Sequence, residues 1–126
     1  MKLNRRNFIS ASAGIAATIS SPMVFGASRP KVVVIGGGAG GATAARYIAK
    51  DSKGAIDVTL VEPTRSYYTC FFSNLYLGGF RDFDSIGHSY GKLASDFGIN
   101  VVHDWAVDVD SSGKIVSLAG GGTLNY

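Results

Sequence analysis

Three features of this sequence carry groups that could hold a cofactor: a run of glycines, a carboxylate and a single cysteine. Gly36, Gly38 and Gly41 have the G-x-G-x-x-G spacing. In this pattern the first glycine allows a tight turn, the second lets the backbone approach a pyrophosphate, and the third lets a helix pack on a strand. A helix that begins here presents free N–H groups and its positive dipole end to phosphates. We therefore expect the phosphate site to include Gly36, Gly38, Ala39, Gly40 and Gly41.

The elements around the glycines fit this role. Residues 32–35 are four β-branched residues that predict a buried strand, and the alanine-rich residues 39–50 predict a helix. A second strand is predicted over residues 56–62. It ends at Glu62, 21 positions after Gly41, where a carboxylate accepts hydrogen bonds from an adenosine ribose. A plain glycine turn and a surface acid are the alternatives, but strand, helix and acid in register favour dinucleotide binding.

The rest of the chain predicts further α/β elements. A long loop over residues 64–89 has no predicted secondary structure of its own, and such loops are usually functional or disordered. After it we expect a helix over 90–97, a parallel strand over 99–103, a hairpin over 106–118 and a strand from 124 that returns to the main sheet. Ala106 begins the hairpin, and we expect its backbone to lie near the adenine.

The first 26 residues predict an export signal. Arg5 and Arg6 precede an apolar, alanine-rich stretch in a pattern similar to a twin-arginine signal. Serines and a proline interrupt this stretch, so it is too short and polar for the roughly 20 residues of a membrane-spanning helix. We therefore expect cleavage before Ala27, a mature domain of residues 27–126, a periplasmic location and no transmembrane segment.

The charge balance gives no sign of a nucleic-acid partner. The chain has 12 basic and 9 acidic residues. The excess of three comes from the leader, so the remaining chain is formally neutral. No basic stripe with interleaved aromatic residues occurs, which disfavours nucleic-acid binding.

The single cysteine, Cys70, leads to a family. One cysteine is usually a small buried hydrophobic residue, and it forms no disulfide within these residues. Cys70 however ends the segment Tyr-Tyr-Thr-Cys of residues 67–70, just after the predicted ribose-binding strand. The chain resembles the flavoprotein subunit of flavocytochrome c sulfide dehydrogenase, within the wider sulfide:quinone reductase-like flavoproteins, at residues 32–45, 58–63, 67–74 and 101–104. The twin-arginine leader matches as well.

The resemblance implies an FAD-dependent oxidoreductase. Its fold would be α/β: a Rossmann-like FAD-binding half-domain with a parallel sheet and a β-meander, incomplete as a two-dinucleotide-binding fold. The resemblance further implies that Cys70 carries FAD through a thioether, that sulfide is the substrate and that a c-type cytochrome takes the electrons. The redox-active cysteine pair of that family lies further along the chain. We therefore expect no catalytic residue among residues 1–126, and poor cofactor binding by this N-terminal part alone.

Two other functions stay open. One is a relative of the membrane-surface sulfide:quinone or NADH dehydrogenases, and the other is a truncated, non-catalytic chain. Among the remaining candidate residues, His88 and His103 lack partners for acid–base or metal chemistry and are predicted to be structural or at the surface. Trp105 is predicted to have a packing role. The aromatic cluster around Cys70 is predicted to form core on the flavin side, and lining a partner surface is the alternative.

Overall fold

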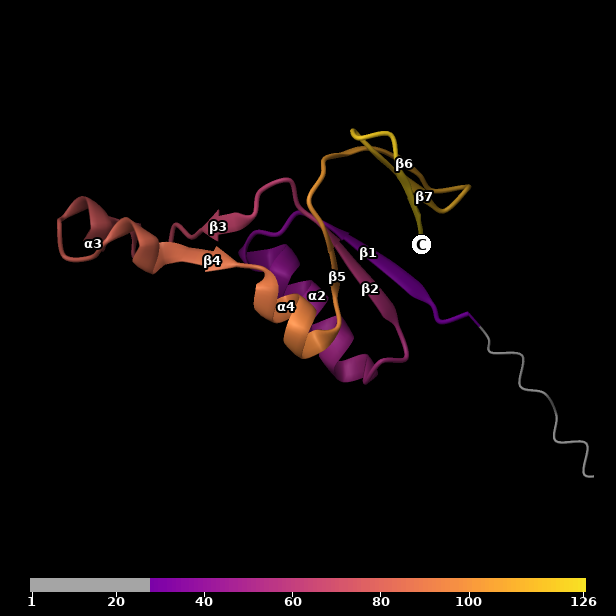
Figure 1. Ribbon diagram of the computed structural model, residues 1–126, viewed down its shortest axis with the longest axis horizontal. Helices are drawn as coiled ribbons and strands as arrows, with labels where there is room; N and C mark the ends of the chain where they lie inside the picture. The colour runs from indigo at the N-terminus through magenta and orange to yellow at the C-terminus, as the bar shows by residue number, and fades with distance from the viewer. Residues whose placement is uncertain (1–27) are drawn as a thin grey trace, which may run out of the picture.

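The computed structural model describes residues 28–126, and the predicted export signal lies outside them. At the centre is a three-stranded parallel sheet in the order β1-β2-β5 (Figure 1). The elements that form and cover it are β1 (Lys31–Ile35), α2 (Ala39–Ser52), β2 (Asp57–Val61), α4 (Gly91–Phe97) and β5 (Asn100–Val102). These elements confirm the predicted α/β class, and the parallel pairing of the third strand confirms its predicted direction.

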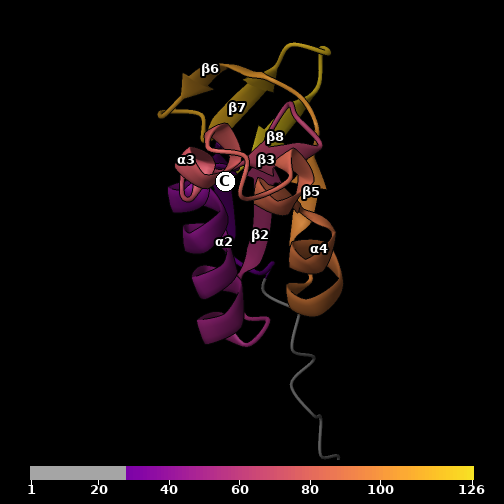
Figure 2. The same ribbon diagram turned by 90° about the vertical axis from the view of Figure 1, so that its left-hand side faces the viewer.

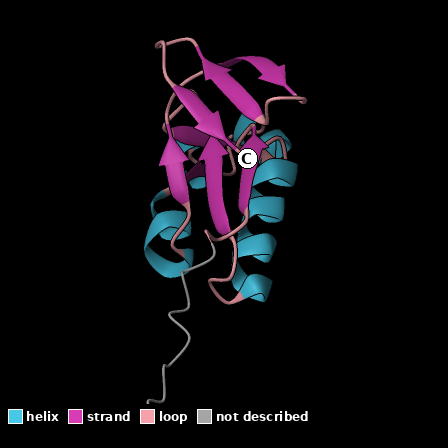
Figure 3. Ribbon diagram, turned by 90° about the vertical axis from the view of Figure 1, so that its right-hand side faces the viewer, coloured by secondary structure: helices cyan, strands magenta, loops and turns pink. Residues whose placement is uncertain are grey.

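Both helices cover one face of this sheet. Val34 pairs with Leu60 in parallel register, and these side chains point to the same face as Val58 because side chains alternate along a strand. On α2, Ala42, Ala45, Ile48 and Ala49 face the strands; their spacing puts them on one side of a helix. Figure 2 shows α2 and α4 side by side, and Figure 3 looks onto the sheet from the opposite face. No helix within residues 28–126 is long and apolar enough to cross a membrane.

The segment predicted to be a long loop has secondary structure. It contains β3 (Ser66–Tyr68), α3 (Ser73–Leu77), the 3-10 helix η1 (Phe83–Ile86) and β4 (Gly87–Ser89). β3 and β4 pair antiparallel, with Tyr67 opposite His88. Together these elements form an arm that projects from the body of the protein (Figure 1). The prediction failed because each strand has three residues, too few to show an alternating pattern.

Besides the β3–β4 pair, the chain forms a three-stranded antiparallel sheet after β5. It consists of β6 (Ala106–Asp110), β7 (Ile115–Leu118) and β8 (Thr123–Asn125) in that order. The hairpin between β6 and β7 confirms its prediction, and Asp110 Oδ1 accepts hydrogen bonds from the turn amides of Ser112 and Gly113, both at 2.9 Å. The prediction that the last strand returns to the main sheet was wrong. β8 pairs with β7, because the β7–β8 connection is short enough to make a second hairpin.

Candidate cofactor site

The glycine turn joins the carboxyl end of β1 to the start of α2. Gly36 has φ +96°, a conformation that favours glycine, and its amide donates a 2.8 Å hydrogen bond to the carbonyl oxygen of Val61. Gly38 is the N-cap of α2, and no side chain caps the helix. The helix has 14 residues and no acidic residue in its first turn. Its N-terminal amides and positive dipole end are therefore available to an anion at the edge of the sheet.

The glycines of the turn are needed for two different reasons. A Cβ atom on Gly41 would lie 1.8 Å from the carbonyl oxygen of Gly36, so only glycine lets the helix approach the strand. A Cβ atom on Gly38 would meet nothing closer than Tyr67 Cε2 at 3.8 Å, and one on Gly40 would meet nothing within 4 Å. The protein's own packing leaves the space beside Gly38 and Gly40 open. This space is where the G-x-G-x-x-G pattern places a pyrophosphate.

The carboxylate of Glu62 lies beside this turn. Oε2 accepts a hydrogen bond from the amide of Gly37 at 2.7 Å. Oε1 accepts hydrogen bonds from the amide and the hydroxyl of Thr64, at 2.9 and 2.6 Å. Burial acts to raise the pKa of Glu62, but these hydrogen bonds outweigh it and the pKa is lowered below its usual value. Glu62 is therefore ionised at neutral pH and can accept hydrogen bonds from sugar hydroxyls.

A groove of about 320 Å³ opens at the carboxyl edge of the sheet. It brings together three of the predicted site residues, Gly36, Glu62 and Ala106. Trp105 also lines it, with 65% of its surface exposed, so its predicted packing role does not bury it in the interior. Its backbone explains the placement: the amide of Ala119 donates to the carbonyl oxygen of Trp105, which ties this residue to the meander above the sheet edge.

Cys70 lies outside this groove, at the end of β3 on the arm. It is exposed, and it is the one cysteine among residues 1–126. Its carbonyl oxygen accepts a 2.9 Å hydrogen bond from the hydroxyl of Ser73, which fixes its backbone at the start of α3. The neighbouring aromatic side chains are exposed too, Phe71 by 61% and Phe72 by 58%. Tyr67 of the same cluster packs against the buried core, whereas Phe71 and Phe72 do not. A core on the flavin side stays a prediction.

The base of the arm touches the glycine turn. Tyr67 in β3 approaches Gly38, and Tyr90, which precedes α4, donates a 3.0 Å hydrogen bond to the carbonyl oxygen of Gly37. His103 Nδ1 lies 3.0 Å from the carbonyl oxygen of Glu62, while His88 is an exposed residue of β4. Both histidines thus hold structural or surface positions, as predicted. No group of three or more metal-ligating side chains occurs among residues 28–126.

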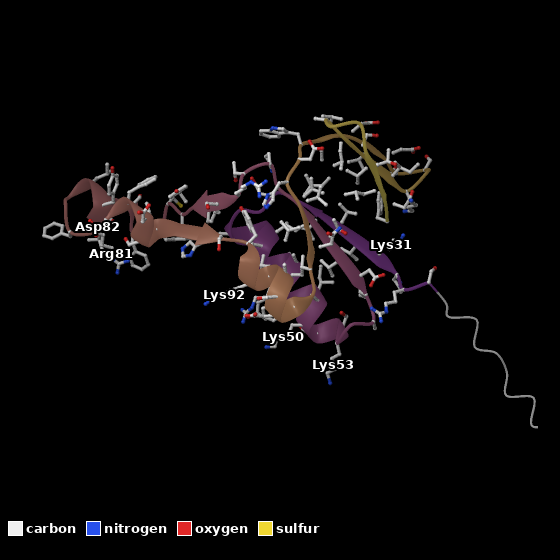
Figure 4. All side chains as sticks on the ribbon, in the orientation of Figure 1. Lys31, Lys50, Lys53, Arg81, Asp82 and Lys92 are labelled. Carbon is white, nitrogen blue, oxygen red and sulfur yellow. The ribbon has the colours of Figure 1, made fainter. Side chains whose placement is uncertain are left out.

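The charged side chains at the far end of α2 and on the arm lie away from the glycine turn. Figure 4 shows Lys50 and Lys53 at the far end of α2, away from the glycine turn, and Arg81 and Asp82 on the arm. A phosphate at the turn would be held mainly by backbone amides and the helix dipole, as in other glycine-rich dinucleotide sites. The open space at Gly38, the ionised Glu62 and the groove therefore fit the pyrophosphate and adenosine parts of a dinucleotide.

Comparison with known proteins agrees with this geometry. Residues 30–126 match the sequence profile described as pyridine nucleotide-disulphide oxidoreductase. The chain belongs to this family. Its FAD-binding, Rossmann-like fold is therefore the one expected from the sequence, and FAD is the dinucleotide that the family context assigns to the site.

Individual proteins also resemble this chain. The chain is 54% identical over 44 residues to the flavoprotein chain of sulfide dehydrogenase [flavocytochrome c] from Chlorobaculum thiosulfatiphilum, a match that covers 35% of this chain and 90% of the other. It also resembles the sulfide:quinone oxidoreductase structure from Aquifex aeolicus, with 26% identity and a TM-score of 0.68 over 77% of this chain. The match spans 22% of that chain's length.

A third structure shares the fold. The water-forming NADH oxidase from Lactobacillus brevis superposes with a TM-score of 0.69 and 24% identity, over 77% of this chain and 23% of that one. The resemblance to sulfide-oxidising flavoproteins proposed from residues 32–45 and 67–70 is confirmed by the first two relatives.

Three residues at the site were missed by sequence reasoning: Gly37, Thr64 and Tyr90. Gly37 stands at a variable position of the glycine pattern, and Thr64 follows the strand that ends at Glu62. The signal available for Gly37 was its place in a run of three consecutive glycines, residues 36–38, where the pattern needs glycine only at the first and the third. Nothing in the sequence connects Tyr90 to a turn 53 positions away.

Proposed function

We propose that this chain forms the FAD-binding part of an exported flavoprotein oxidoreductase that oxidises sulfide and passes the electrons to a c-type cytochrome. The observation that carries the FAD assignment is the arrangement at the sheet edge. Open space at Gly38, the ionised carboxylate of Glu62 and the groove at Ala106 follow one another in the order of pyrophosphate, ribose and adenine.

Each of these groups has one role in the proposal. The N-terminal amides of α2, at Ala39, Gly40 and Gly41, bind the pyrophosphate. Glu62 accepts hydrogen bonds from the ribose hydroxyls, and the backbone at Ala106 with the side chain of Trp105 forms the wall beside the adenine. FAD, when bound, supplies a centre that accepts two electrons and gives them up singly.

The sulfide and cytochrome parts rest on the relatives. The Chlorobaculum protein is named as the flavoprotein chain of a sulfide dehydrogenase, and the name adds flavocytochrome c. Oxidation of sulfide to sulfur at the zero oxidation level releases two electrons, and two one-electron haem acceptors take them. The twin-arginine pattern at Arg5 and Arg6 supports assembly in the cytoplasm before export to the periplasm.

We include in the proposal a covalent bond between Cys70 and FAD. Its support is the Tyr-Tyr-Thr-Cys segment, the exposed position of Cys70, and an arm whose base lies against the glycine turn through Tyr67 and Gly38. Cys70 Sγ would bond to the flavin 8α carbon. The bond would leave two hydrogens, one from that carbon and one from the thiol, to be carried by the flavin ring, and the protein's electron acceptor would have to take up the corresponding electron pair.

A second function has one specific observation in its favour. The likeness to the Aquifex sulfide:quinone oxidoreductase favours a quinone as the electron acceptor. The test uses the purified full-length protein with sulfide and either a c-type cytochrome or a soluble ubiquinone analogue. We expect sulfide-dependent reduction of the cytochrome at 550 nm. Reduction of the quinone alone would support the second function, and reduction of neither acceptor by a flavin-loaded protein would contradict both.

A further inference from the structure

The backbone of Gly37 is held on both sides of its Cα atom. Its amide donates to Glu62 Oε2 at 2.7 Å, and its carbonyl oxygen accepts a hydrogen bond from Tyr90 Oη at 3.0 Å. Tyr90 is 4% exposed and belongs to the core between the helices and the sheet. The N–H and C=O of Gly37 lie in neighbouring peptide planes that are joined at its Cα atom. Holding the carbonyl oxygen, with the tyrosine ring packed beside the Cα atom, therefore restricts the φ and ψ rotation of Gly37 and so limits where its amide can point.

We infer that Tyr90 is a positioning residue for the nucleotide site: its hydroxyl and ring restrain the backbone of Gly37, whose amide in turn holds the Glu62 carboxylate in place for the ribose. The inference rests on the FAD binding proposed above. It adds a residue from a distant part of the chain that neither the glycine pattern nor the family profile assigns to this site.

The fit between Tyr90 and Gly37 is close enough to require glycine. A Cβ atom on Gly37 would lie 2.6 Å from Tyr90 Oη and 2.7 Å from two carbon atoms of the ring. Position 37 is variable in the G-x-G-x-x-G pattern, so the phosphate does not demand glycine there. In this chain the tyrosine ring occupies the space that a side chain would take.

The carboxylate needs this support because its other oxygen is held only locally. Oε1 is bound by Thr64, two residues along the same strand end. The bond from Gly37 is the one that ties Glu62 to the turn where the pyrophosphate would lie. If the Gly37 amide were not held in place, the side chain of Glu62 would populate more rotamers. Ordering it on binding would then cost more free energy, and the affinity for the ribose would fall.

The groups around the Tyr90 hydroxyl keep it a donor. Burial, followed by the nearby Glu62 charge, raises its pKa, so the hydroxyl stays protonated throughout the physiological range. The ring of Tyr90 also lies 6.1 Å from the ring of His103, whose Nδ1 contacts the carbonyl oxygen of Glu62. Tyr90 therefore also lies near the end of β2 at Glu62 through the ring of His103.

The test is a double-mutant cycle on FAD affinity in the full-length protein. Tyr90→Phe keeps the ring and removes the hydroxyl, and Glu62→Ala removes the group through which Tyr90 is inferred to act. All proteins carry Cys70→Ser so that FAD binding is reversible, and the dissociation constant is measured by flavin fluorescence. We expect Tyr90→Phe to raise the dissociation constant at least fivefold when Glu62 is present and less than twofold in the Glu62→Ala background.

A purely structural role for Tyr90 would give a different result. It would raise the dissociation constant equally in both backgrounds, or leave it unchanged in both, and either outcome overturns the inference. Tyr47→Phe is the matched control, because Tyr47 is a half-exposed tyrosine on α2; it should change the affinity less than twofold. If Tyr90→Phe does not fold, Gly37→Ala breaks the same contact from the other side and takes its place in the cycle. A parent protein that binds no FAD would instead refute the proposed function.

Discussion

Gly38 and Gly41 belong to one motif, yet alanine should destabilise the fold only at Gly41. In Gly41→Ala the new Cβ atom would lie 1.8 Å from the carbonyl oxygen of Gly36, so backbone must move. Such overpacking costs about 1–3 kcal/mol, and the gain in helix propensity returns about 1 kcal/mol. Because the clash is with backbone, we expect a net loss of roughly 2 kcal/mol in the free energy of unfolding.

Gly38→Ala should leave the fold intact and damage only cofactor binding. Gly38 has φ −65° and ψ −176°, which alanine adopts without strain, and its nearest contact would be 3.8 Å away. The unfolding free energy should stay close to that of the parent, because alanine restricts the unfolded chain but is a poorer N-cap residue than glycine. The methyl group would occupy the pyrophosphate space. Loss of one charge-assisted hydrogen bond, about 1.5–3 kcal/mol, raises the FAD dissociation constant roughly 10- to 150-fold.

Two measurements on the full-length protein check this contrast: urea unfolding of the apoprotein, and FAD affinity in the Cys70→Ser background. Gly122→Ala is the matched control, because its Cβ atom would make an ordinary 3.7 Å contact with Leu118 in the β-meander; neither quantity should change appreciably. If Gly38→Ala binds FAD like the parent, the pyrophosphate does not lie at this turn. If Gly41→Ala is as stable as the parent, the close contact between Gly41 and Gly36 is wrong.

Three further predictions address the carboxylate, the cysteine and the leader. The lowered pKa of Glu62 means that its hydrogen bonds stabilise the fold at neutral pH, and this contribution is lost as the pH falls below about 4.5. In urea unfolding measured against pH, Glu62→Gln should therefore reduce the loss of stability below this pH. An unchanged profile would refute the hydrogen bonds assigned to Glu62. Acid denaturation of the full-length protein should leave flavin mass on the peptide that contains Cys70, and Cys70→Ser should release it; free flavin from the parent would exclude the thioether. Replacement of Arg5 and Arg6 by lysine should retain the full-length precursor in the cytoplasm, and normal export of this variant would contradict a twin-arginine signal.

Local sequence patterns predicted the part of the site that depends on local structure. The strand before Gly36 and the helix after Gly38 follow from residue types and periodicity, and both have the predicted places. Glu62 reaches the turn because the carboxyl ends of neighbouring parallel strands meet at one edge of the sheet. These inferences needed no knowledge of packing between distant segments.

The features that sequence reasoning missed depend on such packing. β3 and β4 are separated by 18 residues and recognise each other through six backbone positions, which leave no periodic signal. Trp105 is exposed because a meander carries it over the groove, and no local pattern distinguishes it from a core tryptophan. Tyr90 reaches Gly37 only after the sheet and α4 have assembled. Long-range contacts of this kind are set by tertiary structure, which single-sequence patterns do not encode.

A crystal structure of the full-length, flavin-loaded protein would test the cofactor assignment most directly. We predict that the adenosine ribose lies within hydrogen-bond distance of the Glu62 carboxylate and that the pyrophosphate lies against the N-terminus of α2 beside Gly38. A dinucleotide bound elsewhere, with the groove between Glu62 and Ala106 empty, would contradict the assignment.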